Sequence, residues 1–168
     1  MGKVSTYWHR ARLVLAPPRT LGEVEARVVK GWPQVVHLTP AQAAAQVACG
    51  SAMLVDVRTE RECALSHIVG ATRSSGQDIP SPAAGVRLII LYCAVGIRSA
   101  RLAMRLGRVV RGPADTTFAN LSGGIFRWHA EGRALENDHG RTRALHPYSA
   151  RWQHLTDCIA MHRSRIVE

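Results

Sequence analysis

The chain has 168 residues, 46% of them hydrophobic, which is enough for one domain with a substantial core and terminal extensions. Its 22 lysines and arginines outnumber 12 aspartates and glutamates, giving a formal net charge of +10 that attracts anions. The basic residues are scattered without interleaved aromatic residues, so nucleic-acid binding is not indicated, and no stretch approaches the roughly 20 apolar residues of a membrane span.

Residues 1–33 are expected to form an N-terminal extension with a short helix. The apolar patch at 13–16 is too short for a signal-peptide core and two prolines follow it, which favours a cytoplasmic protein. Thr20 and Glu23 have the spacing of a capping box, which predicts a helix that ends near Gly31. Four apolar residues share one face of this helix: Leu21, Val24, Val28 and Val29.

From residue 34 onward, strand and helix patterns alternate. Apolar runs predict strands at 35–38, 53–55, 86–92 and 116–121, with a brief strand in 67–72. Helices are predicted after Thr39, with proline first, after Thr59, which begins a capping box, and over 99–106 and 123–131. The run at 86–92 is continuously apolar, as in the centre of a parallel sheet. This alternation predicts an α/β domain with a mainly parallel sheet and right-handed crossovers.

The C-terminal residues 136–168 are interpreted as a linker followed by an amphipathic helix. Residues 135–145 are polar and mixed in charge, which predicts the linker, and His146-Pro147 is predicted to begin the helix. Four residues then share one face, which we interpret as a packing surface: Tyr148, Trp152, Leu155 and Ile159.

Cys93 stands directly after the central strand and before a helix, in LYCAVGIRSARLAMRL. Ligands of open α/β sheets bind beyond the carboxyl ends of strands, where turn amides and a helix start attract anions. Gly96 permits a tight turn, and Arg98 supplies a cation. A thiol in this setting loses its proton more easily, so Cys93 is a candidate reactive thiolate. A buried, inert core cysteine remains the alternative.

The other cysteines, Cys49, Cys63 and Cys158, form no CxxC pair, and no His/Cys spacing resembles a zinc site. A disulfide framework or structural zinc is therefore not expected. Cys49 and Cys158 fall on predicted helices, where packing is the simpler role. Cys63 follows Asp56 and Arg58; a packing role is the simpler interpretation, with a resolving thiol near the site as the alternative.

Three segments in chain order resemble a rhodanese-like domain. LVDVRTERECALSHIVGA (54–71) resembles the family's strand with its Asp-x-Arg and His-Ile-Pro-Gly-Ala motifs. YCAVGIRSARLA (92–103) resembles its active-site cysteine, six-residue loop and following helix, and NLSGGIFRWHAEGRAL (120–135) resembles its Leu-x-Gly-Gly ending. The resemblance covers about residues 34–135. LHPYSARWQHL (145–155) is also similar to a tail that follows some bacterial members.

This resemblance implies a three-layer fold, with a mainly parallel five-stranded sheet and helices on both faces. It also implies a thiosulfate sulfurtransferase-like enzyme, in which Cys93 takes sulfane sulfur as a persulfide and passes it to a thiol or cyanide. Arg98 would hold an anionic donor, and Asp56 and Arg58 would support the loop. The cradle around the sulfur would comprise Ala94, Val95, Gly96, Ile97 and Ser99. The implied partners are a small anionic sulfur donor and an acceptor or carrier protein; no metal or cofactor is implied.

The sequence departs from the family pattern at several points. Ser66 replaces a glycine, Val69 replaces a proline, Cys63 stands where an aromatic residue is usual, and the segment after Ala71 is short. These changes concern the edge of the sheet and leave the nucleophile in place. Because Arg98 is the one charged side chain of the loop, the physiological donor could differ from thiosulfate.

Two other functions remain open at this stage. A non-catalytic rhodanese-like module that binds a partner protein would suit the terminal extensions and the basic surface. A phosphatase or arsenate reductase would use a related cradle, but one residue longer between cysteine and arginine. Here four residues separate Cys93 from Arg98, which favours sulfur over a tetrahedral phosphate.

Overall fold

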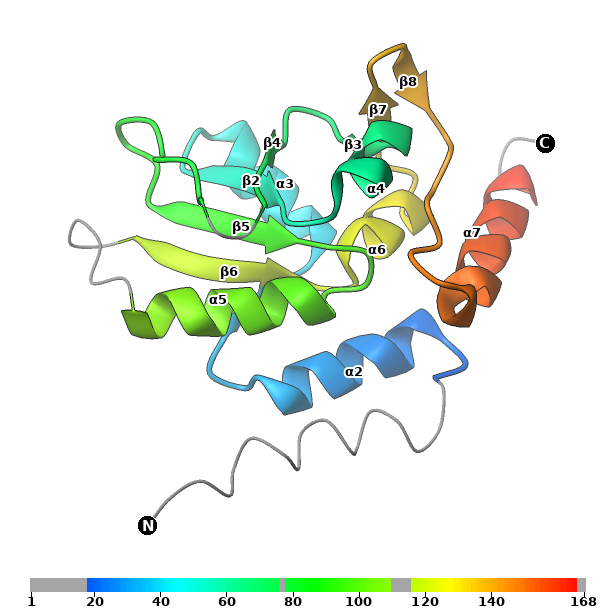
Figure 1. Cartoon of the computed structure of the whole chain (residues 1–168), viewed down its shortest axis with the longest axis horizontal. Helices are drawn as coiled ribbons and strands as arrows, with labels where there is room; N and C mark the ends of the chain where they lie inside the picture. Colours follow the sequence, from blue (N-terminus) through cyan, green and yellow to red (C-terminus); the bar gives the residue numbers. More distant parts are fainter. Residues whose placement is uncertain (1–17, 76–77, 110–115, 166–168) are drawn as a thin grey trace.

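The computed structural model describes residues 18–75, 78–109 and 116–165. A five-stranded, all-parallel sheet lies at its centre, in the order β1-β6-β5-β2-β4 (Figure 1). These strands are β1 (Val36–Leu38), β6 (Thr117–Leu121), β5 (Leu88–Tyr92), β2 (Ala52–Asp56) and β4 (Thr72–Arg73). Four predicted strands are therefore confirmed to within two residues. The brief strand expected within 67–72 is instead two short strands, β3 (His67–Ile68), which lies outside this sheet, and the edge strand β4.

Helices cover both faces of this sheet (Figure 1). They are α2 (Leu21–Gly31), α3 (Pro40–Ala48), α4 (Glu60–Leu65), α5 (Ile97–Val109), α6 (Gly124–Ala130) and α7 (Gln153–Arg165), with a short 3₁₀ turn, η1 (Ala150–Trp152), before α7. Alternate residues of β5 enter two cores. Ile90 belongs to a core cluster with residues of α2, α3, α6 and α7, whereas Ile89 belongs to a second cluster with Leu102 of α5. This arrangement is the predicted three-layer α/β fold.

The helix starts show which local signals were sufficient. Thr39 and Thr59 each form a complete capping box with the residue three positions later, as predicted for Thr59. Thr20 also caps α2, but the carboxylate of Glu23 accepts the amide of Arg19 at 2.9 Å, so the predicted capping box is only half formed. Leu21, Val24 and Val28 of the predicted apolar face are buried, whereas Val29 is 44% exposed and lies at the edge of that face.

The segment that was expected to be a linker contains a β-hairpin instead. Strands β7 (Leu135–Asn137) and β8 (Gly140–Thr142) pair with each other, and β7 pairs antiparallel with β3 (His67–Ile68). The pairing joins residues almost 70 positions apart, which a local reading of polarity does not reveal. The predicted domain boundaries at residues 33 and 135 stay predictions.

Two helices begin at other residues than predicted. α5 starts at Ile97, so the loop after Cys93 is shorter than expected. The final helical segment starts at Ala150, and Tyr148 lies before it with a φ of 65° and is 45% exposed. Trp152, Leu155 and Ile159 are buried as predicted, but Tyr148 does not belong to their face.

The apolar patch at 13–16 lies outside the described residues. In the three described ranges, no helix is both long and apolar enough to cross a bilayer.

Candidate functional site: the loop after Cys93

Cys93 follows the last residue of β5 and is 1% exposed. Its carbonyl oxygen accepts the amide of Ile125 at 2.9 Å, and that of Ala94 accepts the amide of Phe126 at 3.1 Å. These bonds tie the loop to the first turn of α6. Because its carbonyls turn toward α6, the loop leaves its amides available: within the described residues, no N–H group from 94 to 99 donates a hydrogen bond.

Two glycines make this loop geometry possible. Gly96 has a φ of +91°, in the region that favours glycine, and a Cβ there would lie 3.3 Å from the carbonyl oxygen of Leu121. A Cβ on Gly124, which has a φ of +56°, would lie 2.3 Å from the Cys93 carbonyl oxygen. Gly124, in the Leu-x-Gly-Gly motif, therefore lets α6 approach the cysteine loop.

The hydroxyl of Ser99 lies next to the thiol. Its Oγ is 3.5 Å from Cys93 Sγ and donates a 2.7 Å hydrogen bond to Oδ1 of Asn120. Both Ser99 and Asn120 are 0% exposed. Asn120 Nδ2 in turn lies 3.1 Å from Nδ1 of His37, on β1. Polar groups from α5, β6 and β1 thus converge behind the sulfur.

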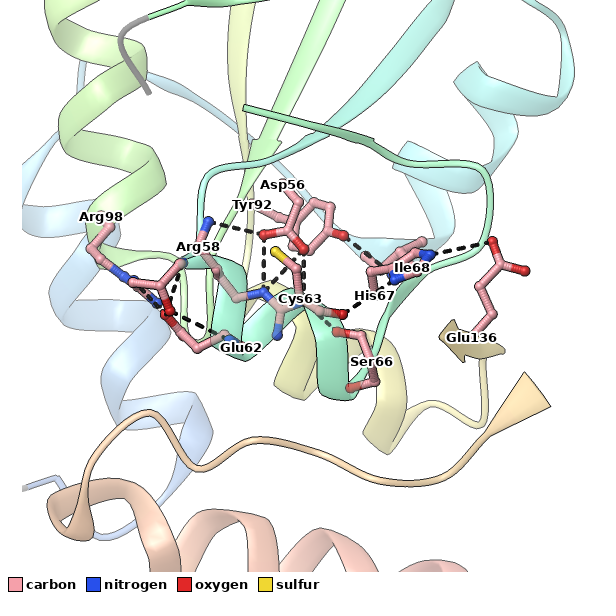
Figure 2. A network of polar contacts seen from close by, with 11 residues as sticks. Asp56, Arg58, Glu62, Cys63, Ser66, His67, Ile68, Tyr92, Arg98 and Glu136 are labelled. Carbon is pink, nitrogen blue, oxygen red and sulfur yellow. Dashed lines mark hydrogen bonds and ion pairs between the residues drawn. The ribbon is translucent and has the colours of Figure 1, made fainter. Parts of the chain in front are cut away.

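Arg98 forms the outer wall of the site. Its guanidinium makes two hydrogen bonds to the Glu62 carboxylate, at 2.6 and 2.9 Å, and lies 4.2 Å from the ring centre of Tyr148 (Figure 2 shows the pair with Glu62). Burial lowers the pKa of Arg98, but the bonds to Glu62 and the nearby Cys93 outweigh burial and raise that pKa above its ordinary value. The guanidinium therefore stays charged beside the cysteine.

Glu62 remains ionised for the same reason. Burial raises the pKa of Glu62. The hydrogen bonds from Arg98 and Thr59 outweigh burial and lower the pKa to about 2. The carboxylate accepts the Thr59 amide at 3.1 Å and the Thr59 hydroxyl at 2.8 Å, so the capping box of α4 also positions the partner of Arg98.

Asp56 and Arg58 form a second ion pair, deeper in the protein (Figure 2). Arg58 Nε lies 2.9 and 3.1 Å from the two carboxylate oxygens, and Nη2 reaches Oδ2 and the Ser66 carbonyl oxygen, both at 2.6 Å. Burial lowers the pKa of Arg58, but the contacts with Asp56 raise it well above its ordinary value. The Arg58 guanidinium also lies 5.7 Å from the ring centre of Tyr92.

The deeper pair lies at the ends of β2 and β5, the strand that leads into Cys93. Asp56 is the register partner of Tyr92, the residue before Cys93, and the Val57 amide donates to the Tyr92 carbonyl at 3.0 Å. The Tyr92 hydroxyl accepts the Ile68 amide at 3.1 Å. Asp56 and Arg58 thus lie next to the loop's point of departure rather than at the thiol.

Cys63 is a poor second nucleophile. It lies beside Asp56 and Arg58, is 6% exposed, and burial followed by the charge of Asp56 raises its pKa to about 12. Cys49 and Cys158 are exposed. Among the described residues, no three His, Cys, Asp or Glu side chains are grouped so as to hold a metal.

Sequence reasoning missed four residues that complete the site. The spacing from Thr59 predicts only a helix cap for Glu62, and the apolar pattern predicts a packing face for Tyr148. Asn120 and His37 were not singled out, although Asn120 begins the Leu-x-Gly-Gly segment. A polar residue at the end of an apolar strand, beside the strand that carries the cysteine, was the available signal.

The comparisons with known proteins identify the family and the fold. The family model described as "Rhodanese-like domain" matches residues 39–131, more than half of the chain. The chain belongs to the rhodanese-like domain family, and its fold is that of the family.

Solved structures of low sequence identity share the fold. Thiosulfate sulfurtransferase from Pseudomonas aeruginosa is 21% identical with a TM-score of 0.53, and the match covers 89% of this chain but only 28% of that one. A protein from Rhodopseudomonas palustris, described as a "possible tyrosine phosphatase", is 21% identical over 72% of this chain and 97% of its own, with a TM-score of 0.51. A Bacillus halodurans protein is 20% identical, with coverages of 71% and 88% and the same TM-score. No curated protein matches the chain.

Proposed function

We propose that this protein is a sulfurtransferase that carries sulfane sulfur as a persulfide on Cys93. One observation carries the proposal: the thiol stands at the carboxyl end of the central strand, directly before six backbone amides, those of residues 94–99, that donate no hydrogen bond within the described residues. Such amides, together with the start of α5, form a cradle for negative charge. Membership of a family with sulfurtransferase members supports the same reading.

The chemistry takes two displacements at sulfur. In the first, the Cys93 thiolate attacks the outer sulfur of a donor such as thiosulfate, so that a new S–S bond forms and sulfite leaves with the electrons of the broken bond. In the second, a thiolate or cyanide attacks the terminal persulfide sulfur, and Cys93 leaves as a thiolate. No oxidant or metal is consumed. The loop amides and Arg98 would stabilise the anionic persulfide between the steps.

The proposed partners are a small anionic donor and a thiol acceptor, free or on a carrier protein, and the proposed location is the cytoplasm. A net charge of +10 favours the approach of anions. Arg98 is the charged group of the loop, and its ion pair with Glu62 leaves its side chain 29% exposed. Because Glu62 offsets part of this charge, we expect a singly charged persulfide donor to compete well with doubly charged thiosulfate.

The test is thiocyanate formation from thiosulfate and cyanide, together with mass spectrometry of the protein for one added sulfur. Cys93→Ser should abolish both signals, whereas Cys158→Ser, which changes an exposed thiol on α7, should retain them. Low-molecular-weight persulfides should be assayed in parallel as donors. If the wild-type protein gains no sulfur from any donor, the proposal fails.

A failed transfer assay would favour the non-catalytic binding module. The observation in its favour is the 1% exposure of Cys93, which requires some movement before a donor reaches the sulfur. Hydrolysis of an aryl phosphate that depends on Cys93 would instead indicate phosphatase chemistry.

A further inference from the structure

The segment 143–149, called the strap below, connects β8 to η1 and is drawn in orange between β8 and α7 in Figure 1. Two local hydrogen bonds close its last turn. The amide of Tyr148 donates to Nδ1 of His146 at 2.9 Å. The amide of Ser149 donates to the carbonyl oxygen of Pro147 at 2.7 Å. This turn holds Tyr148 in place against the site.

Two observations single out Tyr148. Its backbone φ is 65°, and no other non-glycine residue of the described ranges has a positive φ. This conformation is strained for a residue with a Cβ, and strained residues cluster at ligand clamps and active sites. The centre of its ring also lies 4.2 Å from the guanidinium carbon of Arg98. A strained turn therefore presents an aromatic ring to the charged group of the cysteine loop.

Arg98 is already occupied on a second side. Its Nη1 and Nη2 atoms lie 2.9 and 2.6 Å from the two oxygens of the Glu62 carboxylate. This pair carries no net charge, so a doubly charged anion is repelled by the carboxylate as well as attracted by the guanidinium. A doubly charged anion also loses more hydration than a singly charged one when it enters a protein site. The surroundings of Arg98 therefore favour a donor with one charge.

The ring of Tyr148 adds an apolar group beside this ion pair. Tyr148 is 45% exposed, so it can contact a molecule that approaches Arg98 from solvent. An organic thiosulfonate, R–SO₂–S⁻, has the same outer sulfur as thiosulfate, a single negative charge and an apolar group R. An aromatic R group can pack on the tyrosine ring, whereas inorganic thiosulfate has no group that can do so. The ring therefore distinguishes the two kinds of donor.

We propose that Tyr148 is a specificity-determining residue that selects singly charged organic donors over inorganic thiosulfate. Its ring covers one side of the Arg98 guanidinium, so an anion that bonds to Arg98 from this side must first displace the ring. A donor with an aromatic group regains a contact by packing on that ring. This inference rests on the proposed function, but the effect of Tyr148 on anions can be measured without sulfur transfer.

The transfer step follows the same chemistry as with thiosulfate. The Cys93 thiolate attacks the outer sulfur of the thiosulfonate, and a new S–S bond forms. The sulfinate, R–SO₂⁻, leaves with the electrons of the broken S–S bond. Cyanide then removes the terminal sulfur, and Cys93 leaves as a thiolate. The two donors thus give the same persulfide and differ only in how they bind before the attack.

The experiment compares kcat/KM for benzenethiosulfonate and for thiosulfate, with cyanide as the acceptor. A variant that only contains less active protein changes both constants equally, so their ratio isolates selectivity. In Tyr148→Ala, kcat/KM for thiosulfate should rise about three-fold, the factor that corresponds to one exposed cation–π contact. The constant for benzenethiosulfonate should not rise, because the lost contact with the ring offsets the gain at Arg98.

Three further variants show which part of Tyr148 matters. Tyr148→Phe keeps the ring and should keep the wild-type ratio of the two constants. Tyr148→Gly relieves the backbone strain but should give the same ratio as Tyr148→Ala, because neither variant has a ring. Ser149→Ala is the matched control on the strap, since the Ser149 side chain makes no capping bond to η1, and it should leave the ratio unchanged.

A second measurement needs no sulfur transfer. Iodoacetate and iodoacetamide are nearly equal in size, but only iodoacetate is charged. Mass spectrometry of the peptide that contains Cys93 follows its alkylation separately from that of the other cysteines. In Tyr148→Ala, the alkylation rate with iodoacetate should rise about three-fold relative to the rate with iodoacetamide.

The outcomes separate this inference from the proposed function. Unchanged ratios in a folded Tyr148→Ala protein would overturn the selectivity role. So would an equal rise with both alkylating reagents, which would make Tyr148 a steric cover. If no donor is turned over, the expected alkylation ratio would keep the role of Tyr148 in anion selection and remove the proposed function. No alkylation of Cys93 by either reagent would show that small molecules do not reach the sulfur, which overturns both.

Discussion

Two arginine–carboxylate pairs flank the start of α4, and they differ in depth (Figure 2). In the inner pair, the Arg58 and Asp56 side chains are 0% and 2% exposed, and Arg58 also bonds to the Ser66 carbonyl. In the outer pair, the Glu62 side chain is 3% exposed, but that of Arg98 is 29% exposed and stacks on Tyr148. The charges of the fully buried pair interact only with each other and with nearby protein groups, whereas the partly exposed outer arginine can still contact an anion from solvent. The inner pair is therefore structural, and the outer pair borders the loop after Cys93.

The largest effect should come from breaking the inner pair. Arg58→Met leaves the Asp56 carboxylate buried without compensation, so the free energy of unfolding should fall by about 3 to 5 kcal/mol. Urea denaturation would measure this loss. The double variant Asp56→Leu/Arg58→Met, which removes both charges, should recover most of it. Arg98→Met should cost less, about 2 kcal/mol, because Thr59 still donates two hydrogen bonds to the buried Glu62 carboxylate. An equal loss at both arginines would remove the contrast between the pairs.

The outer pair should be visible as a pH dependence of stability. The pKa of Glu62 is lowered from its ordinary 4.5 to about 2, so the unfolded chain binds a proton before the folded chain does. Its contribution, about 2 to 3 kcal/mol, is present above roughly pH 5 and is lost as the pH falls toward about 2. Denaturation midpoints across this range should fall more steeply for wild type than for Glu62→Gln. Parallel curves for the two proteins would contradict the assignment.

The inner network also contains a defect that can be repaired. Ser66 Oγ is buried and has no hydrogen-bond partner among the described residues, and Ser66 stands where the family has glycine. Ser66→Ala removes this unsatisfied hydroxyl from an extended backbone position, so stability should rise by about 1 kcal/mol. Ser99→Ala is the matched control, because that equally buried hydroxyl is bonded to Asn120 and its loss should cost about 1 kcal/mol. A loss of stability on Ser66→Ala would mean that the hydroxyl has a partner.

The sequence was sufficient where local patterns decide the structure. An apolar run predicts the central strand, a capping box predicts the start of α4, and Gly96 predicts the turn after Cys93. Each of these signals lies within a few residues of the feature that it predicts. The partners of the loop come from elsewhere in the chain. Asn120 and His37 are 83 residues apart, and β7 pairs with a two-residue strand, so neither contact has a local signal. Glu62 was visible as a cap, but its second role depends on how α4 faces α5.

Tyr148, which stacks on Arg98 of the outer pair, has a strained backbone, and its substitution should have the smallest effect on stability. Tyr148 has a φ of 65°, a conformation that costs a residue with a Cβ about 1 kcal/mol. Stacking of its ring on Arg98 stabilises the folded protein by about 0.5 to 1 kcal/mol. Tyr148→Phe should be neutral because it keeps the ring. Tyr148→Ala keeps the strain and loses the ring, so it should destabilise by about 0.5 to 1 kcal/mol. Tyr148→Gly loses both and should be about 1 kcal/mol more stable than the alanine variant. If glycine and alanine give the same urea midpoint, the strain is absent in solution, and the stacking alone explains why Tyr148 lies against Arg98.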